Sequence, residues 1–358
     1  MIIECSLDEF NGKDISSVVL IGAGKNAREI LENQSWNIRY IIDSNDSINE
    51  IKSGNKTLPV LTWDEGIRQI NVHDVIVISP SLFVELREKI LAIDELKNHD
   101  CYLYIIMKAI QWDYDRELAS NVPFEITRGS NAIIPKTIHY FWFSGDPYPD
   151  KIKRCIDSWY KYCEGYEIKQ WNLENYRTDC AFCNEALAKR SWAFASDYGR
   201  CDVLFQYGGI YLDSDVELVR PLDDLLYDEG FMCFESNAGV DPGSGMGAVA
   251  KHSIMRDIRE RYHGLHYVDE YGNVYQPNIM NLYTDVLKKY GLKSGSQYQR
   301  VNGFAIYPPL VFSPYSYMTF RTQPYDNVYA IHHWVSSWVT QKRKQELEES
   351  KEYFSHSL

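Results

Sequence analysis

Two aspartates separated by one residue, Asp213 and Asp215, are the side chains in this sequence best placed to do chemistry. They directly follow a short apolar run, Ile210 to Leu212, which itself follows a pair of glycines. Residues i and i+2 of a strand share a face, so both carboxylates would point the same way at the carboxyl edge of a sheet. Like charges held together are costly unless a cation lies between them, and hard divalent cations bind both carboxylate and diphosphate oxygens. The pattern favours a metal site that also takes a phosphorylated ligand.

A second unusual pair, Asp197 and Arg200, precedes these aspartates. Asp197 lies on the apolar stripe of a predicted helix, with Phe194 before it and Cys201 after it at helical spacing. A carboxylate in that position is costly unless it is paired or faces a ligand cleft. Arg200 is three residues further on and can reach the same region. The two residues therefore form either a structural ion pair or part of a ligand site.

A glycine-rich turn near the start of the chain is the third pattern. The segment GAGKNA at residues 22–27 follows the apolar run Val18 to Ile21, and Asp43 ends the next predicted strand. In dinucleotide-binding domains and in small nucleotide-sugar-binding modules, glycines such as Gly22 and Gly24 admit a phosphate, and an acidic residue like Asp43 binds a ribose. The turn resembles both, and it equally fits a retained fold that has lost its ligand.

The elements that must position these groups alternate between strand and helix patterns along the whole chain. Strands are predicted at residues 18–21, 38–42, 75–78, 102–106, 137–143, 167–171 and 210–212. Helices are predicted at residues 26–31, from 81, from 150, and as one long helix over about 184–206. Alternation of this kind predicts an α/β fold with parallel sheets. The polar, irregular stretch 119–134 predicts a linker, which gives two domains, residues 1–125 and 126–358.

Composition excludes several classes of protein. The 358 residues are 45% hydrophobic and 24% charged, an ordinary globular balance. No apolar run approaches the roughly 20 residues of a membrane-spanning helix, and the first residues do not resemble a signal peptide. We expect a cytoplasmic protein, with peripheral association at the inner face of the membrane left open. The net charge of −13 argues against nucleic-acid binding, and the eight scattered cysteines show no disulfide framework.

Four separated blocks resemble the glycosyltransferases that carry a DxD sugar-binding motif. The blocks are residues 134–142 (IPKTIHYFW), 170–172 (QWN), 196–215 (from SDYGR to YGGIYLDSD) and 330–338 (AIHHWVSSW). This group includes bacterial capsular-polysaccharide synthesis transferases and yeast-type mannosyltransferases, and the large clostridial glucosylating toxins are more distant members. The resemblance covers about residues 133–338, with the blocks in the family's order.

The resemblance implies a nucleotide-binding transferase fold with a mainly parallel sheet in residues 126–358. Residues 1–125, which it does not cover, resemble a Rossmann-like domain through their glycine-rich turn. The resemblance to the glycosyltransferases also implies a nucleotide-diphosphate sugar as the donor, which we expect to be UDP-linked, and transfer of a hexose with retention at the anomeric carbon. The acceptor would be a hydroxyl of a glycan, free or lipid-linked, in the synthesis of capsule or surface polysaccharide.

The same resemblance assigns a metal site to four residues. Mn²⁺ or Mg²⁺ would be bound by Asp215 directly, and Asp213 would contact the ribose and sugar or reach the metal through water. Either His332 or His333 would complete the coordination. Asp213 and Asp215 thus join Asp197 and Arg200 as the expected catalytic residues.

The remaining matched residues would bind the donor. Trp142 would stack on the nucleobase, while Asp197, Arg200 and Asp213 would hold the sugar and ribose. The other three residues implied to line the donor pocket or to contact the diphosphate are Tyr211, Ser336 and Trp338.

Two other functions are compatible with parts of the sequence. The first is an NAD-dependent nucleotide-sugar oxidoreductase or epimerase run by residues 1–125, although no convincing catalytic set accompanies the glycine-rich turn there. The second is a carbohydrate-binding scaffold with an inactive transferase fold, which the intact Asp213 and Asp215 argue against.

Overall fold

The computed structural model describes residues 2–54, 56–237, 239–335 and 340–356, which divide into two compact units. The first unit contains the chain up to Tyr114, residues 318–320 and the C-terminal helix. The second unit runs from Asp115 to Tyr317 and continues from Arg321. The division falls inside a helix, upstream of the predicted linker, and the independent folding of residues 1–125 stays a prediction.

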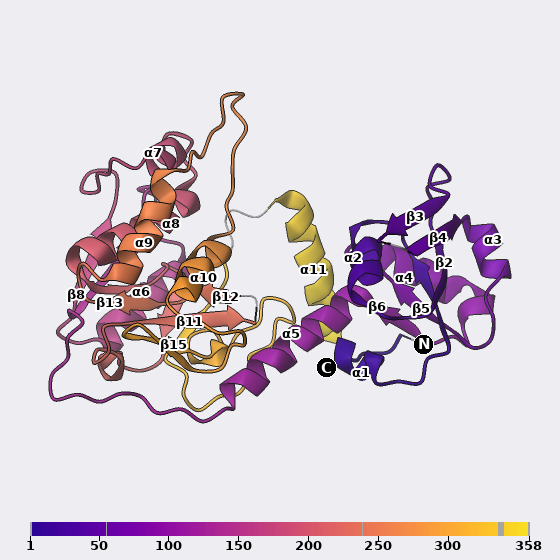
Figure 1. Ribbon diagram of the computed structural model, residues 1–358, viewed down its shortest axis with the longest axis horizontal. Helices are drawn as coiled ribbons and strands as arrows, with labels where there is room; N and C mark the ends of the chain where they lie inside the picture. The colour runs from indigo at the N-terminus through magenta and orange to yellow at the C-terminus, as the bar shows by residue number, and fades with distance from the viewer. Residues whose placement is uncertain (1, 55, 238, 336–339, 357–358) are drawn as a thin grey trace. The chain divides into compact units, whose positions relative to one another are not determined.

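The first unit is built on a six-stranded sheet with the strand order β3-β4-β2-β1-β5-β6 (Figure 1). Its strands are β1 (Ser17–Ile21), β2 (Ile38–Ile42), β3 (Glu50–Ser53), β4 (Lys56–Leu61), β5 (Asp74–Ile78) and β6 (Cys101–Leu103). Only β3 pairs antiparallel to its neighbour. Because β1 lies between β2 and β5, the turn that follows β1 lies where the strand order reverses, which is where such sheets bind ligands.

Helices complete this unit. They are α1 (Leu7–Asn11), α2 (Lys25–Asn33), α3 (Trp63–Arg68), α4 (Val84–Ala92), the start of α5 (Tyr104–Ser120) and α11 (Gln341–His356). In α2, the buried residues Ala27, Ile30 and Leu31 recur at helical spacing, so one face of the helix packs on the core. The charged C-terminal helix is α11, and its Glu349 accepts hydrogen bonds from two backbone N–H groups at the start of α4.

The second unit contains an eight-stranded sheet with the order β14-β15-β11-β13-β9-β7-β8, to which β12 is added beside β11. Its strands are β7 (Thr137–Phe141), β8 (Glu167–Trp171), β9 (Gly209–Tyr211), β11 (Gly230–Ser236), β12 (Gly239–Asp241), β13 (Met246–Ala248), β14 (Gln299–Val301) and β15 (Phe304–Tyr307). Strands β7, β8, β9, β11 and β15 share one direction. The predicted α/β class with mainly parallel sheets is thus confirmed.

Besides the end of α5, a separate two-stranded ribbon and five α-helices accompany this sheet in the described part of the unit. The ribbon pairs β10 (Val216–Leu218) antiparallel with β16 (Ala330–His332). The helices are α6 (Asp150–Tyr162), α7 (Ala181–Ala188), α8 (Trp192–Tyr207), α9 (Ser253–His263) and α10 (Ile279–Lys289), and Figure 1 shows α7, α8 and α9 grouped together. Alternation along the strands separates two cores: Phe141 and Tyr211 face the core with α7 to α10, while Tyr140 and Ile210 face the core with α6.

Two predicted elements differ from the structure. The strand predicted over residues 102–106 ends at Leu103, and α5 begins at Tyr104, because an apolar run without a period fits a strand and a buried helix equally well. The single helix predicted over residues 184–206 is two helices, α7 and α8. Arg190 between them has a φ of 55°, a left-handed conformation that stops α7 without the expected glycine or proline.

Candidate active site

The two aspartates of the DxD motif lie in a tight turn between β9 and β10. Strand β9 ends at Tyr211, so the strand does not continue through the motif as its spacing suggested. The Asp213 N–H donates to the Gly243 carbonyl over 3.0 Å, and the Val216 N–H donates back to the Asp213 carbonyl over 3.0 Å. A side chain at Gly243 would collide with the Asp213 carboxylate, so glycine is needed where this segment passes the motif.

The turn brings both carboxylates close to His332, which lies more than 100 residues later in the sequence. Ligand atoms of Asp213, Asp215 and His332 all lie within 4.8 Å of one another. Strand pairing explains the approach, because Val216 of β10 lies opposite His332 of β16. The Asp215 Oδ1 is 3.4 Å from the His332 Nε2, and its Oδ2 accepts the Val335 N–H over 2.8 Å. Two carboxylates and an imidazole are a donor set that could hold a divalent metal ion.

The other ring nitrogen of His332, Nδ1, contacts Asp241 and Ser244. It is 3.3 Å from the Asp241 Oδ2 and 3.0 Å from the Ser244 Oγ. The Ser244 hydroxyl also donates to Asp241, which in addition accepts the Gly243 N–H over 2.8 Å. The ring of Trp334 stacks on His332, with centroids 3.9 Å apart. A carboxylate on the far nitrogen of an imidazole is the usual arrangement behind a metal-binding histidine, because it fixes the ring and its tautomer.

Asp197 and Arg200 lie in the same site, on helix α8. One guanidinium nitrogen of Arg200 is 2.9 Å from Asp197 and 3.1 Å from Asp213, and the Tyr211 hydroxyl donates to Asp213 over 2.6 Å. The Arg200 side chain is only 6% exposed, so its charge acts in a setting of low dielectric. The pair is therefore both a buried ion pair and a neighbour of the DxD motif.

Burial and neighbouring charges give the carboxyl groups of Asp197, Asp213 and Asp215 different pKa values. Burial raises the pKa of Asp197 to about 7, against the opposing effect of Arg200. Burial also raises the pKa of Asp213. At Asp215 burial acts in the same direction, but the charge and hydrogen bond of His332 outweigh it and hold the pKa at about 2. Asp215 is thus the carboxyl group in the cluster held most firmly in its ionised form.

The other residues predicted for this site lie in different surroundings. His333 is not in the cluster, and its Nε2 lies 2.8 Å from Glu217 on β10. Trp142 follows β7 and is partly buried, with its Nε1–H donating to the Asp146 carbonyl over 2.8 Å and its ring edge-on to Tyr148 at 4.9 Å. Ser336 and Trp338 lie outside the described residues. Asp241 and Ser244 were not assigned from the sequence, although they lie in a glycine-rich segment, DPGSGMG at residues 241–247.

In the first unit, the structure brings the turn at Gly22 and Gly24 to Asp43. The Asp43 Oδ2 accepts the Ala23 N–H over 2.6 Å, and its Oδ1 accepts the Asn45 N–H over 2.8 Å. Gly22 has a φ of 96°, and a side chain there would collide with Pro80. At Gly24 an added Cβ would meet nothing within 4 Å. Gly22 therefore has a structural reason to be glycine, and Gly24 has none within the described chain.

Known proteins resemble the part of the chain that contains most of the candidate site. The capsular polysaccharide synthesis protein family matches residues 97–244, a stretch that contains Asp197, Arg200 and both aspartates of the DxD motif. Inositol phosphoceramide mannosyltransferase 3 of Schizosaccharomyces pombe is 27% identical over 185 residues, which are 49% of this chain and 43% of that protein. Human alpha-1,4-N-acetylglucosaminyltransferase is 28% identical over 158 residues, which are 42% of this chain and 45% of that protein.

The chain spans less than half the length of the curated relatives it matches. Among solved structures, the PaToxG glycosyltransferase aligns with a TM-score of 0.34 and 17% sequence identity over 44% of this chain and 68% of that one. The family match and the two relatives confirm the resemblance carried by the ordered sequence blocks, and they support a glycosyltransferase.

Proposed function

We propose that this protein is a metal-dependent, retaining glycosyltransferase that moves a hexose from a UDP-linked sugar to a hydroxyl of a glycan acceptor. The observation that carries the proposal is the cluster of Asp213, Asp215 and His332 beside the buried Arg200. A divalent cation bound there would neutralise charge on the leaving diphosphate. Fixed positive charge at a developing anion is the main catalytic requirement of such a transfer.

The residues around the cluster have separate proposed tasks. Arg200 holds Asp213 in place, and it adds positive charge that burial keeps strong. Asp197, whose pKa is raised to about 7, is neutral for part of the time near neutral pH and can then donate a hydrogen bond to a sugar hydroxyl. None of these residues is proposed as a covalent nucleophile, which agrees with attack by the acceptor hydroxyl on the face that the diphosphate leaves.

The nucleotide end of the donor is proposed to lie against Trp142. The hydrogen bond from its indole N–H and its contact with Tyr148 fix the ring before a ligand arrives. An aromatic face held in this way loses little entropy when a base stacks on it. Ser336 and Trp338 remain proposed contacts of the diphosphate.

The acceptor is proposed to belong to a capsule or surface polysaccharide, as a free or lipid-linked glycan. The relatives are named for transfer of mannose and of N-acetylglucosamine, which supports a hexose without choosing one. Within the described residues, no helix is both long and apolar enough to cross a bilayer. We propose a cytoplasmic enzyme that meets a lipid-linked acceptor at the inner face of the membrane.

A donor screen tests this function. The full-length protein is incubated with UDP- and GDP-linked hexoses without an acceptor, and release of the free nucleotide is followed with Mn²⁺, with Mg²⁺ and with excess chelator. We expect slow hydrolysis of at least one UDP-sugar, strongest with Mn²⁺ and abolished by chelator. Full activity in chelator would refute the metal dependence, and hydrolysis of GDP-sugars alone would refute the choice of base.

A further inference from the structure

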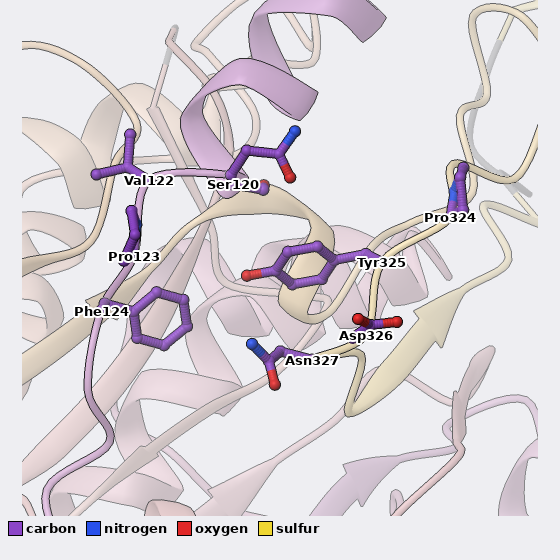
Figure 2. Close-up of a pocket in the computed structure, with 9 residues that line it drawn as sticks. Ser120, Val122, Pro123, Phe124, Pro324, Tyr325, Asp326 and Asn327 are labelled. Carbon is purple, nitrogen blue, oxygen red and sulfur yellow. The ribbon is translucent and has the colours of Figure 1, made fainter.

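A hollow in the second unit lies apart from the metal cluster. It has a volume of about 400 Å³ and lies between two segments far apart in the sequence, residues 120–124 and 324–327 (Figure 2). Both segments belong to the second unit. The volume falls within the range of about 300–1,000 Å³ that small-molecule sites occupy.

The ribbon of β10 and β16 shows why this hollow is not part of the donor site. Val216 pairs with His332 at the end of the ribbon that holds the metal cluster. At the opposite end, the Val219 N–H donates to the Tyr329 carbonyl over 3.0 Å. Beyond that end, Arg220 donates to the Asp326 carbonyl over 2.6 Å. The segment 324–327 therefore leaves the ribbon at the end remote from the cluster.

The chemistry of the lining restricts the ligand. The nine described residues that line the hollow include the aromatic rings of Phe124 and Tyr325, and the amide or carboxylate groups of Asn121, Asp326 and Asn327. None of the nine is lysine, arginine or histidine. The lining offers a phosphate or diphosphate no cationic side chain, because Arg220, which contacts the Asp326 carbonyl, lies over the ring of Tyr329. Asp326 disfavours an anion further. A neutral ligand with an apolar face and several hydroxyl groups fits both kinds of lining group.

The walls of the hollow are built before any ligand binds. Phe124 stacks on Tyr298 with centroids 5.0 Å apart, and it also contacts Tyr307 at 5.7 Å. Each wall contains a proline, and a fixed φ limits the movement of both segments. Figure 2 shows Tyr325 and Asn327 directed from one wall toward the wall that holds Phe124. Rigid rings opposite polar side chains provide stacking and orientation together.

We propose that this hollow binds one neutral sugar unit of a glycan chain. A pyranose presents C–H groups on its face and hydroxyl groups at its rim, which match the rings and the amide and carboxylate groups respectively. That this sugar is a remote unit of the acceptor rests on the proposed function. Binding a remote unit would raise the local concentration of the reactive hydroxyl without any contact at the metal cluster.

Binding of neutral oligosaccharides to the full-length protein tests the inference. The probes are oligosaccharides of two to six units of glucose, galactose, mannose or N-acetylglucosamine, titrated by calorimetry with UDP and Mn²⁺ in excess to fill the donor site. We expect at least one probe to bind, and Tyr325→Ala to weaken its binding roughly tenfold or more. Asn327→Ala, at an exposed residue whose loss should not affect folding, should weaken it as well. Tyr160→Ala, whose side chain on α6 is exposed and lies outside both sites, should bind as the wild type does.

Several outcomes would overturn the proposal. These are the absence of binding by every neutral probe, unchanged binding in both Tyr325→Ala and Asn327→Ala, binding seen only when UDP is left out, or a preference for uronic-acid oligosaccharides. Donor hydrolysis measured on the same preparations separates this proposal from the proposed function. A wild type that binds the sugar but hydrolyses no donor contradicts the transferase and supports the sugar site, while the reverse result contradicts the sugar site alone.

Discussion

Each unit places an aspartate at the carboxyl end of a parallel strand, yet the two aspartates are in opposite situations. Asp43 accepts hydrogen bonds from the backbone N–H groups of Ala23 and Asn45, so its own neighbours satisfy it. Asp213 instead shares Arg200 with Asp197 and lies within 4.8 Å of Asp215 and His332. The topology of the sheet supplies the position in both cases. Whether a carboxylate there can recruit a cation depends on the charges gathered beside it.

The strongest test of this difference between the units is to neutralise one aspartate in each of them. Asp215→Asn removes the carboxylate of the DxD motif whose pKa is held at about 2 and which is proposed to bind the metal, so donor hydrolysis should fall roughly a hundred- to a thousandfold. Asp43→Asn keeps an oxygen that can accept the Ala23 N–H, and hydrolysis should stay close to that of the wild type. Equal losses in two folded variants would contradict the division of tasks between the units.

The opening strands of the two sheets also differ, and the difference predicts a dependence of stability on pH. Strand β1 is apolar from Val18 to Ile21, whereas β7 contains the buried His139. Burial lowers the pKa of His139 from its usual 6.5 to about 4, so the folded state favours the neutral ring. The stability that the neutral His139 ring adds to the fold is therefore fully present above about pH 6.5 and is lost as the pH falls toward 4. Over this range the free energy of unfolding should fall by about 3 kcal/mol.

His139→Gln tests this dependence. Glutamine can still donate to the Gly208 carbonyl and accept from the Trp171 indole, as His139 does, but it does not titrate. Thermal unfolding between pH 4 and 7 should change less steeply with pH in this variant than in the wild type. His263→Gln, at an exposed histidine, should keep the steep dependence. Parallel pH profiles for all three proteins would show that His139 is not the group responsible.

Local patterns allowed much of this fold to be predicted from the sequence. The strands at residues 38–42 and 167–171 have the predicted bounds, because alternation and short apolar runs are local signals. The break at Arg190 could not be predicted, since an arginine with positive φ carries no sequence signal. The approach of His332 to the DxD motif followed only from the family resemblance. No local pattern reveals that β10 pairs with β16, more than 100 residues away.

Asp241 shows the same limit within the site. It lies on β12, which reaches the cluster through its pairing with β11 and through the glycine-rich segment that follows. Nothing near it in sequence marks it as a partner of His332. The residue types of the candidate metal cluster could thus be predicted, whereas the group that orients His332 required the three-dimensional structure.

Asp241 therefore gives the next prediction. Asp241→Asn should weaken Mn²⁺ binding roughly 10- to 100-fold, because the imidazole of His332 loses the carboxylate that orients it. Calorimetric titration of Mn²⁺ into the protein without donor measures this directly. Glu229→Gln is a matched control, since Glu229 lies 3.1 Å from His252 in a carboxylate–imidazole pair outside the cluster. Equal Mn²⁺ affinity in the wild type and Asp241→Asn would remove the orienting role.

A smaller change, in UDP affinity, is expected when Trp142 is replaced, and Trp36 in the first unit provides the control. Both are partly buried, and both donate their indole N–H, to the Asp146 carbonyl over 2.8 Å and to the Asn11 side chain over 2.7 Å respectively. If Trp142 stacks on the donor base, Trp142→Ala should weaken UDP binding about tenfold in the presence of Mn²⁺. Trp36→Ala, in the first unit, should leave UDP affinity unchanged. The stacking role fails if calorimetry gives the same UDP affinity for both variants.

The smallest effect on donor hydrolysis is expected for a substitution at Gly24, in the first unit. This substitution tests whether the first unit takes part in the reaction. An added Cβ at Gly24 meets nothing within 4 Å and its φ is −83°, so Gly24→Val should fold. Gly22→Val should not, because Gly22 has a φ of 96° and lies against Pro80. Since β-branched bulk beside the turn would keep a phosphate from its backbone, Gly24→Val should abolish any nucleotide binding by the first unit. Donor hydrolysis should stay within about twofold of the wild type. If Gly24→Val stops hydrolysis while circular dichroism shows an intact fold, the first unit takes part in the reaction, and the contrast between Asp43 and Asp213 does not separate a catalytic unit from a non-catalytic one.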